Sequence, residues 1–253
     1  MKVALMAEGV VGLAITQYYL QQYPDDLSLV VTIEHNEIFE LVKKNGIRVV
    51  TYESEEAILE ELKFQNIDLG ILVWWPNIFK TKLINYPKQG FINTHPSFLP
   101  YNRGKHFSFW AIVEQAPFGV SIHNVNHKID AGEILSQKQI KYDWCDNGET
   151  LYFKAQEEMV NLFIDLYPSL RIGKVNRRSQ ELKKGSFHLS NEIEEASKIK
   201  LDAMYKGRDL LNRMRARTFS GYPGCWFEED GVRYEVTVEI KKSNVDSTPK
   251  CNK

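Results

Sequence analysis

The sequence predicts an α/β fold: a Rossmann-like, mostly parallel sheet flanked by helices, followed by a small α+β C-terminal unit. Three observations support this prediction. Short apolar runs alternate with amphipathic helical patterns over the first half of the 253 residues. Gly9 and Gly12 stand at the first strand-to-helix turn, where a tight turn needs glycine. The composition, with 43% apolar and 26% charged residues, is typical of a globular protein with its own core.

The first half of the chain is expected to alternate strands with helices. The first strand lies at residues 2–7 (KVALMA), and the helix after it runs to about Gln22. Because helices separate the strands that follow, those strands are expected to pair in parallel. The later strands are expected at residues 28–33, 47–50, 69–74 and 90–93, and the helices at 37–45, at 54–64 and, more weakly, after Pro76.

The pattern changes after residue 104. A helix at 105–115 is followed by strands at 120–125 and 133–140, with only a short polar connection between the two strands. So short a connection favours antiparallel strands added at the edge of the sheet. A long helix then begins at a cap formed by Asn147 and is expected to stop near Pro168, which closes a catalytic domain at residues 1–170.

The rest of the chain is expected to form a second unit at residues 171–241 and a flexible tail at 242–253. Residues 171–184 lack periodic apolar positions and are interpreted as a linker. With about 70 residues, the second unit is too small for a core of its own, so we expect it to dock on the first domain or on a second subunit. Its elements are a helix through Leu201, Met204, Leu210, Leu211 and Met214, a turn at 222–224, and strands at 225–227 and 232–240.

Charge and cysteine content limit the partners and the location. A formal net charge of −1 disfavours nucleic acid as a main partner. Cys145, Cys225 and Cys251 form no CxxC pair, which favours a reducing compartment and therefore the cytoplasm. The apolar N-terminus resembles a signal peptide, but Glu8 interrupts it, and no run reaches the ~18 apolar residues of a membrane span.

The segment FINTHPSFLPYNRG, residues 91–104, contains the strongest candidate for chemistry. Asn93 and His95 lie two apart at the end of a strand, so their side chains project to the same side. An amide donor beside an imidazole suits acyl transfer, in which negative charge grows on a carbonyl oxygen. Asp130, in a polar loop before Gly132, is able to orient the imidazole and move a proton. From spacing alone, purely structural roles for His95 and Asp130 in turns are an equal alternative.

Two other motifs are weaker. Gly9 and Gly12 resemble half of a dinucleotide-binding fingerprint, but Ala7 occupies the place of the first glycine, so a simple tight turn is preferred. His123 and His127 have an HxxxH spacing on a strand and loop, where residues four apart do not share a face. No metal site is therefore predicted.

The two segments INTHPSFLPYNRG and FGVSIHNVNHKIDAGEIL together resemble the formyltransferase family that uses N10-formyltetrahydrofolate. The resemblance covers roughly residues 1–170, with a weaker match near the C-terminal end. It implies that Asn93 and His95 stabilise an oxyanion, that Asp130 assists proton transfer, and that an amine attacks the formyl carbon with no covalent enzyme intermediate. The positions that match the family signature are Asn93, His95, Ser97, Leu99, Pro100, Asp130 and Gly132.

The same resemblance implies a folate site without a metal. N10-formyltetrahydrofolate is expected as co-substrate, with its pterin held by the loop before the signature. Within that loop, Asn77, Ile78 and Phe79 are the candidate cofactor-binding residues, together with Asp130. The alternative is that these aromatic residues, above all Trp74 and Trp75, belong to the ordinary core.

The acceptor suggested by the resemblance is a nucleotide-linked amino-dideoxyhexose, such as dTDP-4-amino-4,6-dideoxyglucose, in O-antigen or surface polysaccharide synthesis. LPYNRGKHFSFWAI and GRDLLNRMRARTFSGYPGCWF resemble segments of nucleotide-sugar N-formyltransferases. Cationic side chains bind a diphosphate, and aromatic rings stack on a nucleobase. A homodimer is also expected. Structural roles are the alternative for the candidate substrate-binding residues, which are Tyr101, Arg103, Lys105, His123, Arg215, Arg217 and Trp226.

Other functions stay open at this point. A phosphoribosylglycinamide or other small-amine formyltransferase is the first alternative, and methionyl-tRNA formylation is disfavoured by the lack of net positive charge. An acyl hydrolase, or a non-enzymatic protein that binds folate or a nucleotide, would share the fold without the transfer.

Overall fold

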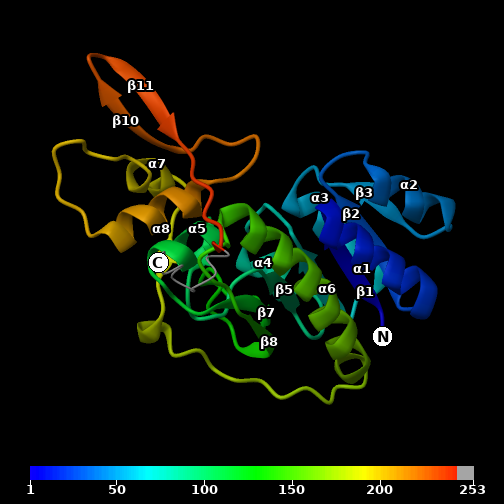
Figure 1. Cartoon of the computed structure of the whole chain (residues 1–253). Coiled ribbons are helices and arrows are strands. Elements are labelled where there is room, and N and C mark those ends of the chain that lie inside the picture. Colours follow the sequence, from blue (N-terminus) through cyan, green and yellow to red (C-terminus); the bar gives the residue numbers. More distant parts are fainter. Residues whose placement is uncertain (244–253) are drawn as a thin grey trace, which may run out of the picture.

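The computed structural model describes residues 1–243 of the chain. Its centre is a seven-stranded sheet in the order β3-β2-β1-β4-β5-β7-β8 (Figure 1). The first five of these strands in the chain pair in parallel, and the last two are added antiparallel through β5–β7 and β7–β8. This confirms the mostly parallel sheet with an antiparallel addition. The strands are β1 (Val3–Ala7), β2 (Leu27–Thr32), β3 (Val49–Thr51), β4 (Leu69–Val73), β5 (Phe91–His95), β7 (Phe118–Asn124) and β8 (Ile134–Ile140).

Helices cover both faces of the sheet because its central strands are apolar on both sides. In β1, alternate side chains point to opposite faces. Val3 and Leu5 enter the larger core cluster, and Ala4 and Met6 enter the smaller one. The larger cluster packs against α1 (Gly9–Gln22), α2 (Glu37–Lys44), α5 (Phe107–Val113) and α6 (Gly148–Arg171), and the smaller against α3 (Glu55–Gln65) and α4 (Thr81–Ile84).

Helix α6 is longer than the sequence pattern indicated. The Asn147 side chain accepts a hydrogen bond from Thr150 N in a capping box, as the cap prediction required. The predicted stop near Pro168 is wrong, because Pro168 lies inside the helix. Tyr167 Oη and Arg171 Nε donate to Asp26 Oδ2 over 2.9 and 2.5 Å. Because Asp26 lies outside the helix, these tertiary contacts stabilise the last turn of α6.

The C-terminal unit also differs from the predicted pattern at its first helix. That helix, α8, spans Gly207–Arg217 and excludes Leu201 and Met204. Met204 is 99% exposed, so no packing interaction holds this stretch in a helix. Ahead of it lies α7 (Glu192–Ala196), and after it the hairpin of β10 (Cys225–Glu229) and β11 (Val232–Val236), which projects from the body (Figure 1).

The segment expected to be a linker is held on the body of the protein. Residue Arg178 forms a bridge with Ile134. Farther along, β9 (Phe187–His188) pairs in parallel with β6 (Arg103–Gly104), just after the short 3-10 helix Leu182–Lys184. Two distant parts of the chain therefore meet beside the residues 91–104 that the sequence analysis singled out.

The ends of the predicted units remain only partly described. The second hairpin strand ends at Val236 rather than at residue 240. Most of the tail predicted at 242–253 lies outside the described residues, and the domain limits at 170 and 241 stay predictions. Within residues 1–243, none of the helices has the length and apolar character that crossing a membrane requires.

Candidate active site

Three side chains predicted from the sequence motif converge at the end of β5. Asn93 and His95 belong to that strand, and Asp130 lies in the connection between β7 and β8. The Nδ1 atom of His95 is 3.5 Å from Asp130 Oδ2, and Asn93 Nδ2 donates to Asp130 Oδ1 over 3.5 Å. The antiparallel pairing of β5 with β7 brings the loop after β7 back to this point, which joins the two halves of the motif.

A fourth side chain, His123, completes the cluster. The β5–β7 register pairs it with Asn93. Its Nδ1 is 2.8 Å from Asn124 O, and because a carbonyl oxygen only accepts, Nδ1 carries a hydrogen. Its Nε2 lies 3.4 Å from Asn93 Nδ2 and 3.5 Å from Asp130 Oδ1. His123 was predicted to bind the acceptor substrate, whereas the structure places it against the catalytic candidates.

Burial and charge set the protonation of this cluster. Burial by itself raises the pKa of Asp130, but the charge of His95, a hydrogen bond from His123 and the Gly104 N–H outweigh it and hold that pKa well below its ordinary value. Burial lowers the pKa of His95, and the opposing effect of Asp130 only partly restores it. At neutral pH the site therefore holds an ionised carboxylate beside a neutral imidazole.

One atom of His95 is left open toward a substrate. Its Nδ1 faces Asp130, whereas its buried Nε2 has no hydrogen-bond partner among residues 1–243. Buried polar groups are normally paired, so an orphaned nitrogen at a strand end indicates a position that a ligand atom fills. When the neutral ring carries its hydrogen on Nε2, this atom can donate a hydrogen bond to a carbonyl oxygen of a ligand.

The loop predicted to bind the cofactor is adjacent to this cluster. It follows β4, whose last residue Val73 pairs with Thr94 in β5. Ile78 is 71% exposed and Asn77 is half-buried, so both are accessible. The ring of Phe79 is 4% exposed and packs at 5.7 Å from the ring of Phe91, so the prediction that this side chain lines the pterin site is corrected: it belongs to the core.

Two of the predicted substrate-binding residues have structural roles instead. Arg215 is 5% exposed, and its guanidinium donates to the carbonyl oxygens of Asp143 and Asp146 over 2.8 and 2.5 Å. It joins α8 to the turn before α6 and presents no free charge to a substrate.

Trp226 is the other. Its indole Nε1 donates to Glu194 O over 3.2 Å, and its ring contacts Lys198 Nζ at 4.7 Å and the Arg233 guanidinium carbon at 4.2 Å. These partners all belong to the C-terminal unit, so Trp226 holds that unit together.

Two further cations, Lys105 and Arg217, lie near the ring of His106. Lys105 is exposed and Arg217 is half-buried, with its Nε lacking a partner among the described residues. Burial lowers the pKa of His106, a hydrogen bond with Ser190 O raises it, and the charges of Arg217 and Lys105 lower it further, which places both cations near one ring. A negatively charged ligand is therefore favoured here.

The side chains of Arg103 and Tyr101 precede this cation group in the chain. Burial lowers the pKa of Arg103, and the charge of Asp130 opposes the shift, so its guanidinium is near the catalytic carboxylate. Its guanidinium carbon also lies 5.8 Å from the Phe187 ring. Tyr101 is half-buried on the same loop.

A row of aromatic side chains was not assigned from the sequence. Trp74 Nε1 donates to Tyr152 Oη over 3.1 Å, and the Tyr152 ring stacks on Phe107 with centroids 5.9 Å apart. Phe219 continues the row at 5.5 Å from Tyr152 and 5.1 Å from Tyr222. These residues come from four separate segments, so spacing in the sequence carries no signal that they meet.

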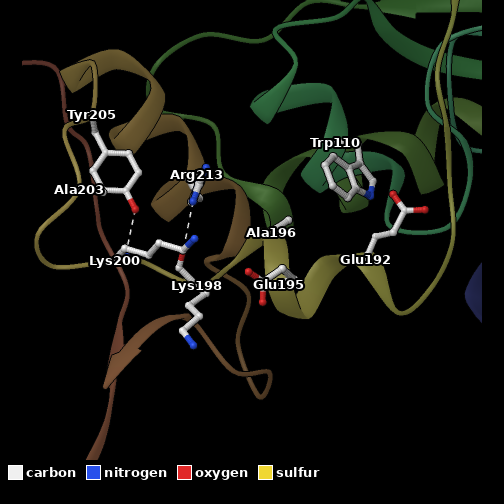
Figure 2. A pocket seen from close by; sticks show the side chains of 9 residues that line it. All are labelled: Trp110, Glu192, Glu195, Ala196, Lys198, Lys200, Ala203, Tyr205 and Arg213. Carbon is white, nitrogen blue, oxygen red and sulfur yellow. Dashed lines mark hydrogen bonds between the residues drawn. The ribbon is translucent and has the colours of Figure 1, made fainter. Parts of the chain in front are cut away.

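A separate cavity of about 580 Å3 lies between α5, α7 and α8 (Figure 2). Trp110 of α5 borders it on one side, and Lys198, Tyr205 and Arg213 border it on the side of the C-terminal unit. It contains none of the predicted catalytic residues. Across residues 1–243, no three His, Cys, Asp or Glu side chains are grouped as a metal site.

Comparison with protein families identifies two matching regions. The family model described as formyl transferase matches residues 23–166, and the model of an N-formyltransferase dimerization C-terminal domain matches residues 192–242. A dTDP-4-amino-4,6-dideoxyglucose formyltransferase of Mycobacterium tuberculosis is 26% identical over 142 residues, which are 56% of this chain and 60% of that protein. A methionyl-tRNA formyltransferase of Listeria monocytogenes is 32% identical over 192 residues, 74% of this chain and 59% of that protein. The chain thus spans about 60% of the length of these relatives.

Solved structures share the fold over nearly the whole chain. A 4-N formyltransferase from Francisella tularensis superposes with a TM-score of 0.80 at 23% identity, covering 96% of this chain and 98% of its own. An N-formyltransferase from Helicobacter canadensis, in complex with folinic acid and dTDP-3-aminofucose, superposes with a TM-score of 0.74 at 20% identity, covering 91% and 85%. With the family model matched over more than half of its residues and the motif residues brought together in space, the chain belongs to the formyl transferase family.

Proposed function

We propose that this protein transfers a formyl group from N10-formyltetrahydrofolate to the amino group of a nucleotide-linked amino-dideoxyhexose. The observation that carries the proposal is the open, buried Nε2 of His95 in a cluster with Asn93 and the ionised Asp130. An amide, a neutral imidazole and a carboxylate are the groups that direct formyl transfer to an amine requires.

The loop before β5 fits the folate donor. Its exposed Ile78 offers an apolar contact to a flat pterin ring, and its backbone offers donors and acceptors. Trp75 adds a buried indole Nε1 that has no partner among the described residues. Asn77 and Ile78, rather than the ring of Phe79, are the side chains that would contact the pterin, and the site needs no metal.

The chemistry assigns one task to each residue of the cluster. The acceptor amine attacks the formyl carbon as a neutral nitrogen, and the Asp130 carboxylate takes the one proton that this nitrogen loses once its new bond has formed. The Asn93 amide donates a hydrogen bond to the oxygen on which negative charge develops, and His95 donates one from Nε2 when the ring carries its hydrogen on that nitrogen. The bond from that carbon to N10 then breaks, and the proton removed from the amine ends on N10. Every bond change occurs between the two substrates, so no covalent enzyme intermediate is needed.

The side chains around His106 and the aromatic row from Trp74 to Tyr222 suit an anionic, flat acceptor. Lys105 and Arg217 supply positive charge for a diphosphate, and the rings of Tyr152, Phe219 and Tyr222 supply surfaces for a base. The relatives whose names state a dTDP-linked amino sugar support this class of acceptor. A homodimer, supported by the dimerization model over residues 192–242, completes the proposal. The cytoplasmic location and the role in surface polysaccharide synthesis stay predictions.

Methionyl-tRNA is the second candidate acceptor. The 32% identity to the Listeria monocytogenes enzyme favours it. The net charge of −1 opposes it, because binding of a nucleic acid depends on basic surface. The likeness to the Helicobacter canadensis N-formyltransferase in complex with dTDP-3-aminofucose supports the sugar instead.

A panel of acceptors tests the proposal directly. The protein is incubated with formyl folate and with dTDP-, UDP- or GDP-linked 3- and 4-amino sugars, phosphoribosylglycinamide, or methionyl-tRNA, and the products are identified by mass. We expect a formylated nucleotide sugar. Formylation of methionyl-tRNA or phosphoribosylglycinamide alone would reject the sugar, and release of formate without any acceptor would indicate a hydrolase.

A further inference from the structure

Residues 178–188, which we name the strap, cross the loop that holds Asp130. The sequence pattern indicated only a linker here. At one end, the backbone of Arg178 exchanges two hydrogen bonds with Ile134, over 2.8 and 2.9 Å. At the other end, β9 pairs with β6. The strap is therefore fixed on both sides of the catalytic loop.

The side chain of Gln180 reaches from the strap to the backbone of this loop. Its Nε2 donates to Asp130 O over 3.0 Å and to Gly132 O over 2.6 Å. Asp130 has a φ of 49°, in the left-handed region that side chains other than glycine seldom adopt. A strained residue persists only where its surroundings hold it, and Gln180 contributes two such restraints.

The far end of the strap acts on the carboxylate itself. Gly104 N donates to Asp130 Oδ2 over 3.0 Å, whereas the contacts of this carboxylate with Asn93, His95 and His123 are 3.5 Å long. The residues on either side of Gly104 are bonded to β9 and its neighbour: Arg103 N donates to Ser186 O and Lys105 N donates to His188 O.

The anchor of β9 is itself buried and well bonded. His188 has its Nε2 at 2.7 Å from Glu114 Oε1 and its Nδ1 at 3.0 Å from Glu192 Oε2. Its ring stacks on Trp110 with centroids 3.7 Å apart. The strap is therefore attached to α5 and α7, so that its position is set by the body of the protein.

We propose that the strap positions the Asp130 carboxylate, with Gln180 as a positioning residue that acts through the backbone of Asp130 and Gly132. The inference rests on the proposed function for its kinetic consequence. Misplacement of a reacting group by 1 Å costs about 100-fold in rate. Loss of the two hydrogen bonds to the carbonyl oxygens of Asp130 and Gly132 is therefore expected to lower kcat measurably.

The kinetic test uses Gln180→Ala and Gln180→Glu in the full-length protein. The first removes the contacts, and the second keeps the size but turns a carboxylate toward two carbonyl oxygens. We expect kcat to fall about 10-fold or more in both, with the KM for formyl folate and the melting temperature near those of the wild type. Gln139→Ala, an exposed glutamine of β8, is the matched control and should retain full activity. Wild-type kcat in both Gln180 variants overturns the proposal.

A second readout does not depend on activity. Burial lowers the pKa of His95; of the charged groups that face it, Asp130 raises this pKa and His123 and Lys105 lower it, and a hydrogen bond with the Asn102 backbone also raises it. NMR titration of the His95 ring should therefore show a lower pKa in Asp130→Asn and a smaller shift of the same sign in Gln180→Ala, with no shift in Gln139→Ala. An unchanged His95 titration in Gln180→Ala would reject the positioning role. A shifted titration in a protein that formylates no acceptor would retain it and reject the proposed function.

Discussion

At the scale of residues, the candidate active site holds two side chains with opposite protonation preferences in one buried space. The Gly104 N–H and the neighbouring side chains hold the pKa of Asp130 below its ordinary value, and burial lowers the pKa of His95, so that the ring is neutral at neutral pH. Neither property is visible in the motif alone, although the motif identified both residues.

Replacing either residue is expected to abolish most of the turnover. His95→Asn and Asp130→Ala should each lower kcat by about 100-fold or more, because they act mainly on the transition state. Formyl folate binding, measured by calorimetry, should remain close to that of the wild type. Turnover near the wild-type rate in both variants would remove the two residues from the mechanism.

The neutral state of His95 has a consequence for pH dependence. Its pKa is lowered in the folded protein by burial, so the unfolded chain binds more protons as the pH falls below about 6.5. The free energy of unfolding should therefore decrease as the pH falls through this range. In His95→Asn, denaturant titrations at pH 7.5 and 5.5 should differ less than in the wild type. An equal pH dependence in the variant would contradict the assignment.

Substitutions of two arginines in α8 should distinguish a structural role from a role in substrate binding. Arg215→Met leaves two buried carbonyl groups unpaired and should destabilise the protein by about 2 kcal/mol, with normal kcat for the folded fraction. Arg217→Met should leave the melting temperature unchanged and raise the KM for the nucleotide sugar by about tenfold. Denaturation curves and steady-state kinetics on both variants measure the contrast, and a reversed pattern would restore Arg215 as a substrate ligand.

At the scale of elements, the antiparallel hairpin of β7 and β8 delivers Asp130 to β5. A Cβ atom at Gly132 would collide with Asn124 O, which explains why glycine follows Asp130 at this spacing. The two strands approach too closely there for any larger residue.

Gly132→Ala is therefore expected to displace the loop. We expect kcat to fall about 100-fold, since the Asp130 carboxylate moves with the backbone. Gly207→Ala is the control, because its Cβ would meet no atom within 4 Å and alanine favours a helix start over glycine. Steady-state kinetics measure kcat for both variants. A wild-type kcat in Gly132→Ala would contradict the proposed role of Gly132.

The sequence patterns predicted those elements whose order depends on local residues. The alternating strands and helices up to β5 followed from apolar periodicity, and the antiparallel addition followed from a short connection. The continuation of α6 through Pro168 depends on Asp26, far away in the chain, so no local pattern contains it. For the same reason Gln180 was read as part of a linker: its partners, Asp130 O and Gly132 O, lie 50 and 48 positions earlier.

At the scale of the whole molecule, the hairpin of β10 and β11 projects from the body (Figure 1). Val232 and Tyr234 are 49% and 47% exposed, and Tyr234 stacks on Phe227 across the hairpin. Exposed aromatic surface on a projecting element is typical of an interface.

The proposed homodimer predicts the effect of a charge on this hairpin. Tyr234→Glu should convert the dimer to a monomer in light scattering coupled to gel filtration, because a buried unpaired carboxylate is costly. Glu229→Gln, at the exposed end of the same hairpin, should remain a dimer. Equal masses for the wild type and Tyr234→Glu would place the interface elsewhere.

The position of the strap along the chain links assembly of the site to synthesis. The sheet ends with β8 at Ile140, so the ribosome has made every strand of it before Gln180 and His188 emerge. Chains fold from the N-terminal side as they are made. If the strap positions Asp130 as proposed, the nascent protein forms its sheet first and completes its candidate active site only after residues 178–188 have been made. Until then the loop that holds Asp130 lacks the two hydrogen bonds from Gln180.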